Sequence, residues 1–300
     1  MGEDRATLQT LAGADAPFLK PPHETLYPCL FEGTAMREDV AERLMGHILP
    51  VLESAYPGAR EWTRFAVVGS GLSYNWDEAG DLDVQVWIDV DRYAAGGGPD
   101  PEHLVKGLRR AAGPVNYPRL ADLGLSTDDC TGAMKVQFYV KAGTGTEREI
   151  LDERPYAAYD LEAGRWIVEP EPLTPEFYAK LFLAVEKRAE ALAEQADDLM
   201  DDLERRLAEA AYWDGLLRQS AGAEYEAQRD EARLAAEQAQ AGVVQIFDTV
   251  FEGREAAYSP EGAGIRDERD ATQKLLEVWG IFGKLKHHAR EPLPWEPPGN

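Results

Sequence analysis

The feature that most constrains the fold is a change of periodicity at 170–172, where the chain reads Pro-Glu-Pro. Before it, short segments alternate apolar and polar residues or are rich in β-branched and aromatic residues, as strands are. After it, apolar residues recur at helical spacing from Thr174 to about Leu217 and again from about Ala221 to Phe251. Two long amphipathic segments with a short break between them favour an antiparallel helical hairpin. The sequence therefore predicts an α+β protein in which a small mixed β-sheet precedes an all-helical region.

The same patterns predict the individual elements and the domain limits. Expected helices cover 38–56, 101–112 and 267–288 in addition to the hairpin, and expected strands cover 65–70, 81–90, 134–141, 156–160 and 165–168. The predicted segments are an N-terminal arm over 1–37, a sheet domain over 38–172, a helical domain over 173–290 and a flexible tail over 291–300.

The net charge of −24 bears on the class of partner. Proteins that bind nucleic acids without sequence preference present basic surfaces, because neutralising phosphates supplies most of the affinity. An acidic chain is repelled by DNA and RNA, and it is more compatible with a small-molecule or protein acceptor. Solubility alone is the other explanation of this charge.

The cysteine content and the apolar runs bear on the compartment. Cys29 and Cys130 do not make a disulfide framework, and no Cys/His cluster has zinc spacing. The N-terminus lacks the basic and apolar regions of a secretory signal. No apolar run reaches the length of a membrane span. We therefore expect a cytoplasmic protein that does not bind membranes.

The segment 65–90 carries the strongest indication of a binding site. An apolar run ends at Gly69-Ser70, and Asp81 and Asp83 follow at the start of an alternating run. Residues two apart in a strand project to the same side, so the two carboxylates should lie together. Paired carboxylates repel each other unless a cation lies between them, and their oxygens suit Mg²⁺. The small turn at Gly69-Ser70 allows backbone amides to approach phosphate oxygens.

This arrangement resembles the signature of the DNA polymerase beta-like nucleotidyltransferase superfamily, a Gly-Ser turn followed after a spacer by Asp-x-Asp on a strand. Gly69, Ser70, Asp81 and Asp83 carry the resemblance, which extends over roughly 38–170. It implies transfer of a nucleoside monophosphate from an NTP to an acceptor hydroxyl. It also implies Mg²⁺ or Mn²⁺ on the two aspartates and a triphosphate tail on the turn.

Members of this family usually have a third carboxylate on a neighbouring strand. Here that strand is expected at 134–141, and its central polar residue is Gln137, which cannot take a proton from a hydroxyl. Asp160, at the end of the next strand, is the first candidate for the catalytic carboxylate. Its alternative role is to close a turn by hydrogen bonding to its own backbone. Glu149 and Asp152 are further candidates.

Other residues are predicted to hold the nucleotide. Ser70 should contact a phosphate, and Ser73 on the spacer loop is a second candidate for such a contact. In related enzymes a helical domain closes over the nucleotide, which implies contacts from Arg254, Arg269 and Lys274. The alternative is that these basic side chains pair with acidic neighbours.

Two functions of different classes follow from these observations. The first is a metal-dependent nucleotidyltransferase with an unknown acceptor. The second is a catalytically inactive nucleotide-binding or assembly protein that uses the helical hairpin as an interaction surface. The carboxylate missing at Gln137 favours the second, and the presence of both Asp81 and Asp83 favours the first. The helices also make an oligomer possible.

Overall fold

The computed structural model describes residues 21–219 and 222–295 of the 300-residue chain, and its fold is mixed α+β, as the sequence predicts. The chain divides into two compact units, which are described separately. Among the described residues, the sheet unit comprises 21–178 and Tyr258–Ile265, and the helical unit comprises 179–219, 222–257 and 266–295.

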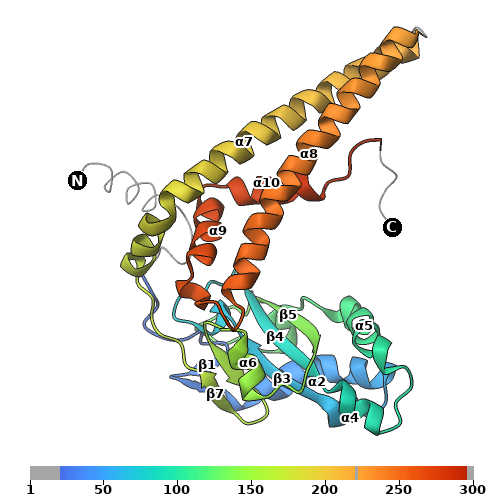
Figure 1. Ribbon diagram of the computed structural model, residues 1–300. Helices are drawn as coiled ribbons and strands as arrows, with labels where there is room; N and C mark the ends of the chain where they lie inside the picture. Colours follow the sequence, from blue (N-terminus) through green and yellow to red (C-terminus); the bar gives the residue numbers. More distant parts are fainter. Residues whose placement is uncertain (1–20, 220–221, 296–300) are drawn as a thin grey trace. The chain divides into compact units, whose positions relative to one another are not determined.

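The sheet unit is built on a five-stranded mixed sheet in the order β5-β4-β3-β6-β7 (Figure 1). Its strands are β3 (Thr63–Val68), β4 (Asp81–Ile88), β5 (Lys135–Ala142), β6 (Ala158–Asp160) and β7 (Arg165–Val168). β4 and β5 are parallel, and the other neighbouring pairs are antiparallel. A parallel pair requires a crossover connection, which here contains helices.

Short helices and a two-stranded ribbon complete this unit. The helices are α2 (Glu38–Ala55), α3 (Ala59–Trp62), α4 (Val90–Ala95), α5 (Pro101–Ala112) and α6 (Glu147–Asp152), and the ribbon pairs β1 (Phe31–Glu32) with β2 (Ala35–Met36). Single 3-10 turns are η2 (Ser70–Leu72), η3 (Gly113–Val115) and η4 (Leu120–Leu123).

The core of the sheet unit lies on one face of the sheet. Alternate residues of β4, from Leu82 to Ile88, are fully buried there with the apolar side chains of α2 and α5. In α2 the buried residues recur every four positions, from Val40 to Leu52, because that spacing places them on one side of a helix. The periodicity thus determines which face of each element is buried.

The described part of the predicted N-terminal arm contributes to this core. Leu26, Tyr27 and Leu30 are at most 2% exposed and belong to the same apolar cluster as β4. The segment 21–37 forms a loop and a short ribbon, and its apolar side chains reach the core from there. This is why its sequence shows neither helical nor strand periodicity.

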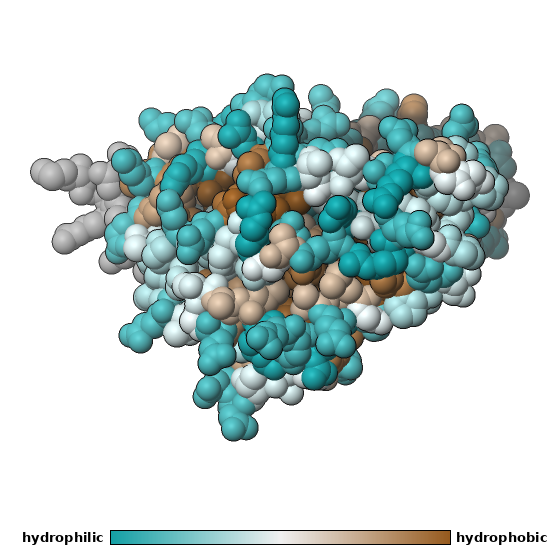
Figure 2. Space-filling view, turned by 90° about the horizontal axis from the view of Figure 1, so that it is seen from below, coloured by the Kyte–Doolittle hydropathy of each residue, from teal (hydrophilic) through white to brown (hydrophobic). Residues whose placement is uncertain are grey.

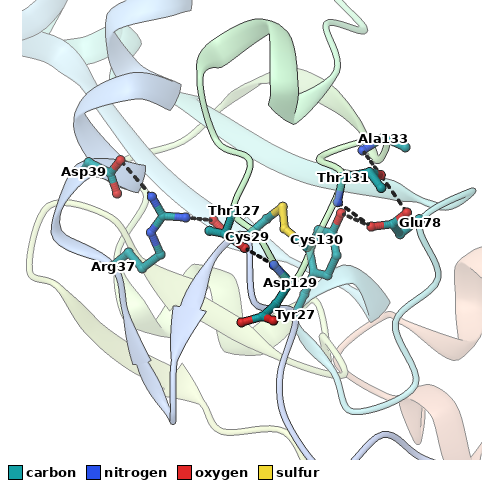
Figure 3. Close-up of a disulfide and its surroundings, with 10 residues drawn as sticks. All are labelled: Tyr27, Cys29, Arg37, Asp39, Glu78, Thr127, Asp129, Cys130, Thr131 and Ala133. Carbon is teal, nitrogen blue, oxygen red and sulfur yellow. Dashed lines mark hydrogen bonds and ion pairs between the residues drawn. A yellow bond between two sulfur atoms is a disulfide. The ribbon is translucent and has the colours of Figure 1, made fainter.

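Cys29 and Cys130 form a disulfide, with Cα atoms 5.8 Å apart (Figure 3). The expectation that these two cysteines make no disulfide framework is corrected by this bond. They are separated by 101 residues, and only the fold brings them together.

The helical unit consists of long helices α7 (Pro175–Gln219) and α8 (Ala223–Ala257) with α9 (Glu268–Val278) and α10 (Ile281–Arg290); the first turn of α7 belongs to the sheet unit. The predicted hairpin is present, because Trp213 stacks on Tyr225 and the Arg233 guanidinium lies 2.9 Å from the Asp214 carboxylate. The helix predicted over 267–288 is interrupted at Gly280, whose φ of +74° ends helical geometry between α9 and α10.

Across residues 21–219 and 222–295, no helix is both long and apolar enough to cross a membrane.

Candidate functional site

Asp81 and Asp83 lie on the side of β4 that faces away from the core. The residues between and beyond them, Leu82 and Val84, are fully buried on the opposite side. Asp83 is opposite Val68 of β3 and Gln137 of β5 in the sheet register. We call this side the Asp83 face; on β4 and β5 it carries Asp81, Asp83, Gln85, Trp87, Lys135, Gln137, Tyr139 and Lys141. The i, i+2 spacing therefore places both side chains on one side of the strand.

The Gly69-Ser70 turn lies directly against the Asp83 carboxylate. A Cβ atom on residue 69 would be 3.1 Å from Asp83 Oδ2, a distance that real Cβ contacts seldom reach. Gly69 also has φ +95° and ψ −167°, a conformation that is essentially restricted to glycine. The backbone conformation therefore favours glycine here, and the Asp83 carboxylate leaves little room for a side chain.

The serines of this loop have different surroundings. Ser70 is exposed at the start of η2, where a ligand can reach it. Ser73 is fully buried, its hydroxyl donates to the Ser70 carbonyl at 2.6 Å, and it accepts the Asn75 amide at 3.0 Å. Ser73 thus holds the loop together, whereas Ser70 is exposed to solvent.

A cavity of about 540 Å³ adjoins Asp83. Gln137 and Tyr139 line it on the Asp83 face, with Arg109 of α5 and Asn116. Asn116 accepts the Phe138 amide at 2.8 Å, and Arg109 Nε donates to the Val140 carbonyl at 2.7 Å. These two side chains satisfy backbone groups at the outer edge of β5, so the cavity is bounded by a closed sheet edge.

Asp160 is not brought to the carboxylate pair. It is opposite Ala66 in the register, so β3 separates it from β4, and two strand spacings amount to about 10 Å. Its Oδ1 accepts the amides of Glu162 and Ala163, each at 2.9 Å, and thereby closes the turn between β6 and β7. This is the turn-closing role that the sequence left open as the alternative.

The other acidic candidates belong to α6. Asp152 is exposed at its last residue. Glu149 caps its first turn, accepting hydrogen bonds from Thr144 and Thr146. Burial raises the pKa of Glu149, but these hydrogen bonds to the ionised form outweigh burial and lower the pKa to about 2. Glu149 thus caps α6, and Asp152 is the last residue of that helix.

Glu153, which was not singled out from the sequence, is the acidic residue that α6 brings to the Asp83 face. One oxygen accepts Gln85 Nε2 at 2.7 Å, and the other pairs with the Lys141 ammonium. Gln85 in turn accepts the Trp87 indole N–H at 2.9 Å. In the sequence Glu153 is distinguished only as an acidic residue just after a short helix. Its role depends on Gln85, which lies 68 positions away.

The predicted basic nucleotide ligands lie in the helical unit and have acidic neighbours there. Asp270 is completely buried, 3.3 Å from Arg254 Nε and 2.8 Å from Lys274 Nζ. The Arg269 guanidinium lies 2.8 Å from the Asp267 carboxylate. The buried Asp270 carboxylate requires such cationic partners, which gives Arg254 and Lys274 a structural role, and Arg269 is paired with the partly exposed Asp267. Binding of a triphosphate by them stays a prediction.

The donor atoms near Asp83 fit a hydrated divalent cation. The described residues contain no group of three or more His, Cys, Asp or Glu side chains arranged to hold a metal. Mg²⁺ commonly keeps several waters and takes one or two protein carboxylates together with substrate phosphates. Asp81 and Asp83 provide that number of carboxylates, and the Gly69-Ser70 turn lies beside Asp83.

Hydrophilic side chains cover most of the surface seen in Figure 2, with apolar side chains in patches between them, in keeping with the net charge of −24. Comparisons of the chain with protein-family models, with curated proteins and with solved structures find no match.

Proposed function

We propose that this protein is a metal-dependent nucleotidyltransferase that moves a nucleoside monophosphate from an NTP to an acceptor hydroxyl. The observation that carries the proposal is the closeness of the Gly69-Ser70 turn to the Asp83 carboxylate: a Cβ atom added to Gly69 would lie 3.1 Å from Asp83 Oδ2. This closeness supports the proposal, because phosphoryl transfer needs backbone amides for the phosphates near carboxylates for the metal.

In this proposal the residues of the sheet unit have separate roles. Asp81 and Asp83 hold Mg²⁺ or Mn²⁺, which neutralises charge on the phosphates. The amides of the Gly69-Ser70 turn and the Ser70 hydroxyl orient the triphosphate tail. Asp160 and Ser73 are left out, because their polar atoms hold the protein's own loops.

The acceptor in this proposal is a small molecule or a protein. The net charge of −24 disfavours a polynucleotide. A cavity of about 540 Å³ beside Asp83 is within the size range of small-molecule sites.

The test is incubation with each labelled NTP and Mg²⁺ or Mn²⁺, with release of pyrophosphate measured in the presence of RNA, protein and aminoglycoside acceptors. Asp83→Asn should reduce transfer by about 10³-fold or more, because the amide does not replace the carboxylate as a metal ligand. Asp128→Asn, an exposed aspartate in the same unit, is the matched control.

A second function is favoured by one observation, namely that Gln137 is opposite Asp83 where a third acid would complete the site. A non-catalytic protein would bind Mg²⁺–NTP in calorimetry and release no pyrophosphate. Unchanged NTP affinity in Asp83→Asn would contradict both functions.

A further inference from the structure

The Cys29–Cys130 disulfide encloses the chain segment that carries the candidate site. It joins the N-terminal segment to the loop before β5, across a sequence separation of 101 residues. The Gly69-Ser70 turn and all of β4 lie within the closed loop. Cys29 is fully buried and Cys130 is 6% exposed, so neither cysteine is open to direct attack by a dissolved thiolate.

Both sides of this disulfide hold one carboxylate, that of Glu78 (Figure 3). Glu78 accepts the Thr131 amide at 3.0 Å and the Thr131 hydroxyl at 2.7 Å, and Thr131 follows Cys130 in the chain. It also accepts the Tyr27 hydroxyl at 3.2 Å, and Tyr27 lies two residues before Cys29. The disulfide therefore fixes Tyr27 and Thr131, the two residues that donate to Glu78, relative to each other.

Glu78 lies on the spacer loop, three residues before Asp81. The hydrogen bond from the Thr131 hydroxyl lowers its pKa, so it is ionised and accepts strongly at neutral pH. Burial and the neighbouring Glu78 carboxylate raise the pKa of Tyr27, which keeps its hydroxyl a donor. Both pKa shifts preserve the hydrogen bonds of Glu78, which connect the disulfide to the spacer loop.

We infer that the Cys29–Cys130 disulfide is an oxidation-dependent clamp that positions the loop leading into Asp81. The bond forms when the two thiols transfer two electrons and two protons to a disulfide oxidant, which is released as its dithiol. Once the fold has buried the two sulfurs, a dissolved reductant does not reach the bond. Its effect on metal binding rests on the function proposed above, whereas its effect on the loop does not.

The experiment measures amide hydrogen exchange over 73–80 without metal or nucleotide, in wild type and in the double variant Cys29→Ser/Cys130→Ser. Exchange over 73–80 should become about tenfold faster in the double variant, while exchange in α10 stays unchanged. Thiol titration of the native wild type should find no free thiol even after treatment with dithiothreitol, and two after unfolding in the same reagent. Unchanged exchange over 73–80, or reduction of the native protein, would overturn the inference.

Glu78→Gln keeps the disulfide and weakens only the link to the loop, so it tests the clamp even where the double variant does not fold. It should speed exchange over 73–80 by a smaller factor, and a wild-type rate would exclude the link. Mn²⁺ binding followed by electron paramagnetic resonance separates the two proposals. If wild type binds no Mn²⁺ while the loop loosens as expected, the proposed function fails and the clamp stands.

Discussion

The two halves of the Asp83 face differ although they lie on the same strands. Around Trp87 the face is covered by α6, and Gln85, Lys141 and Glu153 form a connected set of hydrogen bonds and ion pairs. Around Asp83 the face adjoins the Gly69 backbone and a cavity of about 540 Å³, which extends to Gln85 and Lys141. The alternation that places a side chain on this face is the same in both halves, so the difference arises from what packs above it.

The half under α6 thus has a structural role, and the half around Asp83 is the candidate site. In the covered half polar atoms are paired within the protein, which stabilises the fold and leaves little capacity for a ligand. In the other half Asp81 and Asp83 lie on the same side of one strand, where two carboxylates suit a divalent cation. Substitutions in the covered half should therefore affect stability, and those in the other half should affect binding.

The largest effect on stability is expected for Trp87→Ala. The indole is 5% exposed, packs against Ile150 of α6, and has the Lys141 ammonium 4.4 Å from its ring. Truncation of such a residue costs about 3–5 kcal/mol in the free energy of unfolding, which urea denaturation measures. Tyr139→Ala on the same face is the control, because Tyr139 is 43% exposed and should cost about 1 kcal/mol. Equal losses in the two variants would show that cover by α6 does not distinguish Trp87 from an exposed residue of the same face.

Gly69→Ala should have an intermediate effect on stability and a specific effect on the site. The backbone conformation of Gly69 costs about 1–3 kcal/mol for another residue, and the new methyl group pushes the Asp83 carboxylate away. Binding of Mn²⁺ should weaken in the folded variant. The control is Gly113→Ala, whose Cβ would meet nothing within 4 Å at a helical φ of −49°. A Gly69→Ala variant with wild-type metal binding would show that the turn and the carboxylate act separately.

Glu149→Gln should have the smallest effect, and one that depends on pH. Loss of this cap of α6 costs about 1 kcal/mol near neutral pH. The folded protein lowers the pKa of Glu149 from 4.5 to about 2, so the carboxylate stabilises the fold fully above pH 4.5 and loses this effect as the pH falls towards 2. The difference in unfolding free energy between wild type and Glu149→Gln should shrink over that window. Glu147→Gln, which loses an exposed ion pair with Arg165, provides the comparison.

Local patterns were sufficient for most of the fold. The four-residue spacing in α2 and the two-residue spacing in β4 predict both the element and its buried face, because each depends on neighbours in sequence. The same reasoning placed Asp81 and Asp83 on one side of a strand. It also predicted the hairpin of α7 and α8, although it missed the interruption at Gly280.

What the sequence did not reveal depends on contacts between distant segments. The pairing of Cys29 with Cys130 and of Glu153 with Gln85 requires the folded sheet unit. Asp160 was ambiguous because an aspartate at a strand end suits both a turn and a catalytic site, and only the register with Ala66 decides between them. Disulfides persist mainly in oxidising environments, so Cys29–Cys130 is also the observation against which the predicted cytoplasmic location has to be tested.

The path of the chain between the two units has an evolutionary consequence. The boundary is crossed after Tyr178, after Ala257 and again after Ile265, because the segment Tyr258–Ile265 belongs to the sheet unit. That segment is held there by the Arg154 guanidinium, which donates to the Pro260 carbonyl at 2.8 Å. A single genetic crossover near Tyr178 would transfer the helices together with a piece of the other unit. The two units are therefore expected to be inherited as one piece, and gene-shuffling libraries should keep 258–265 with its parental sheet.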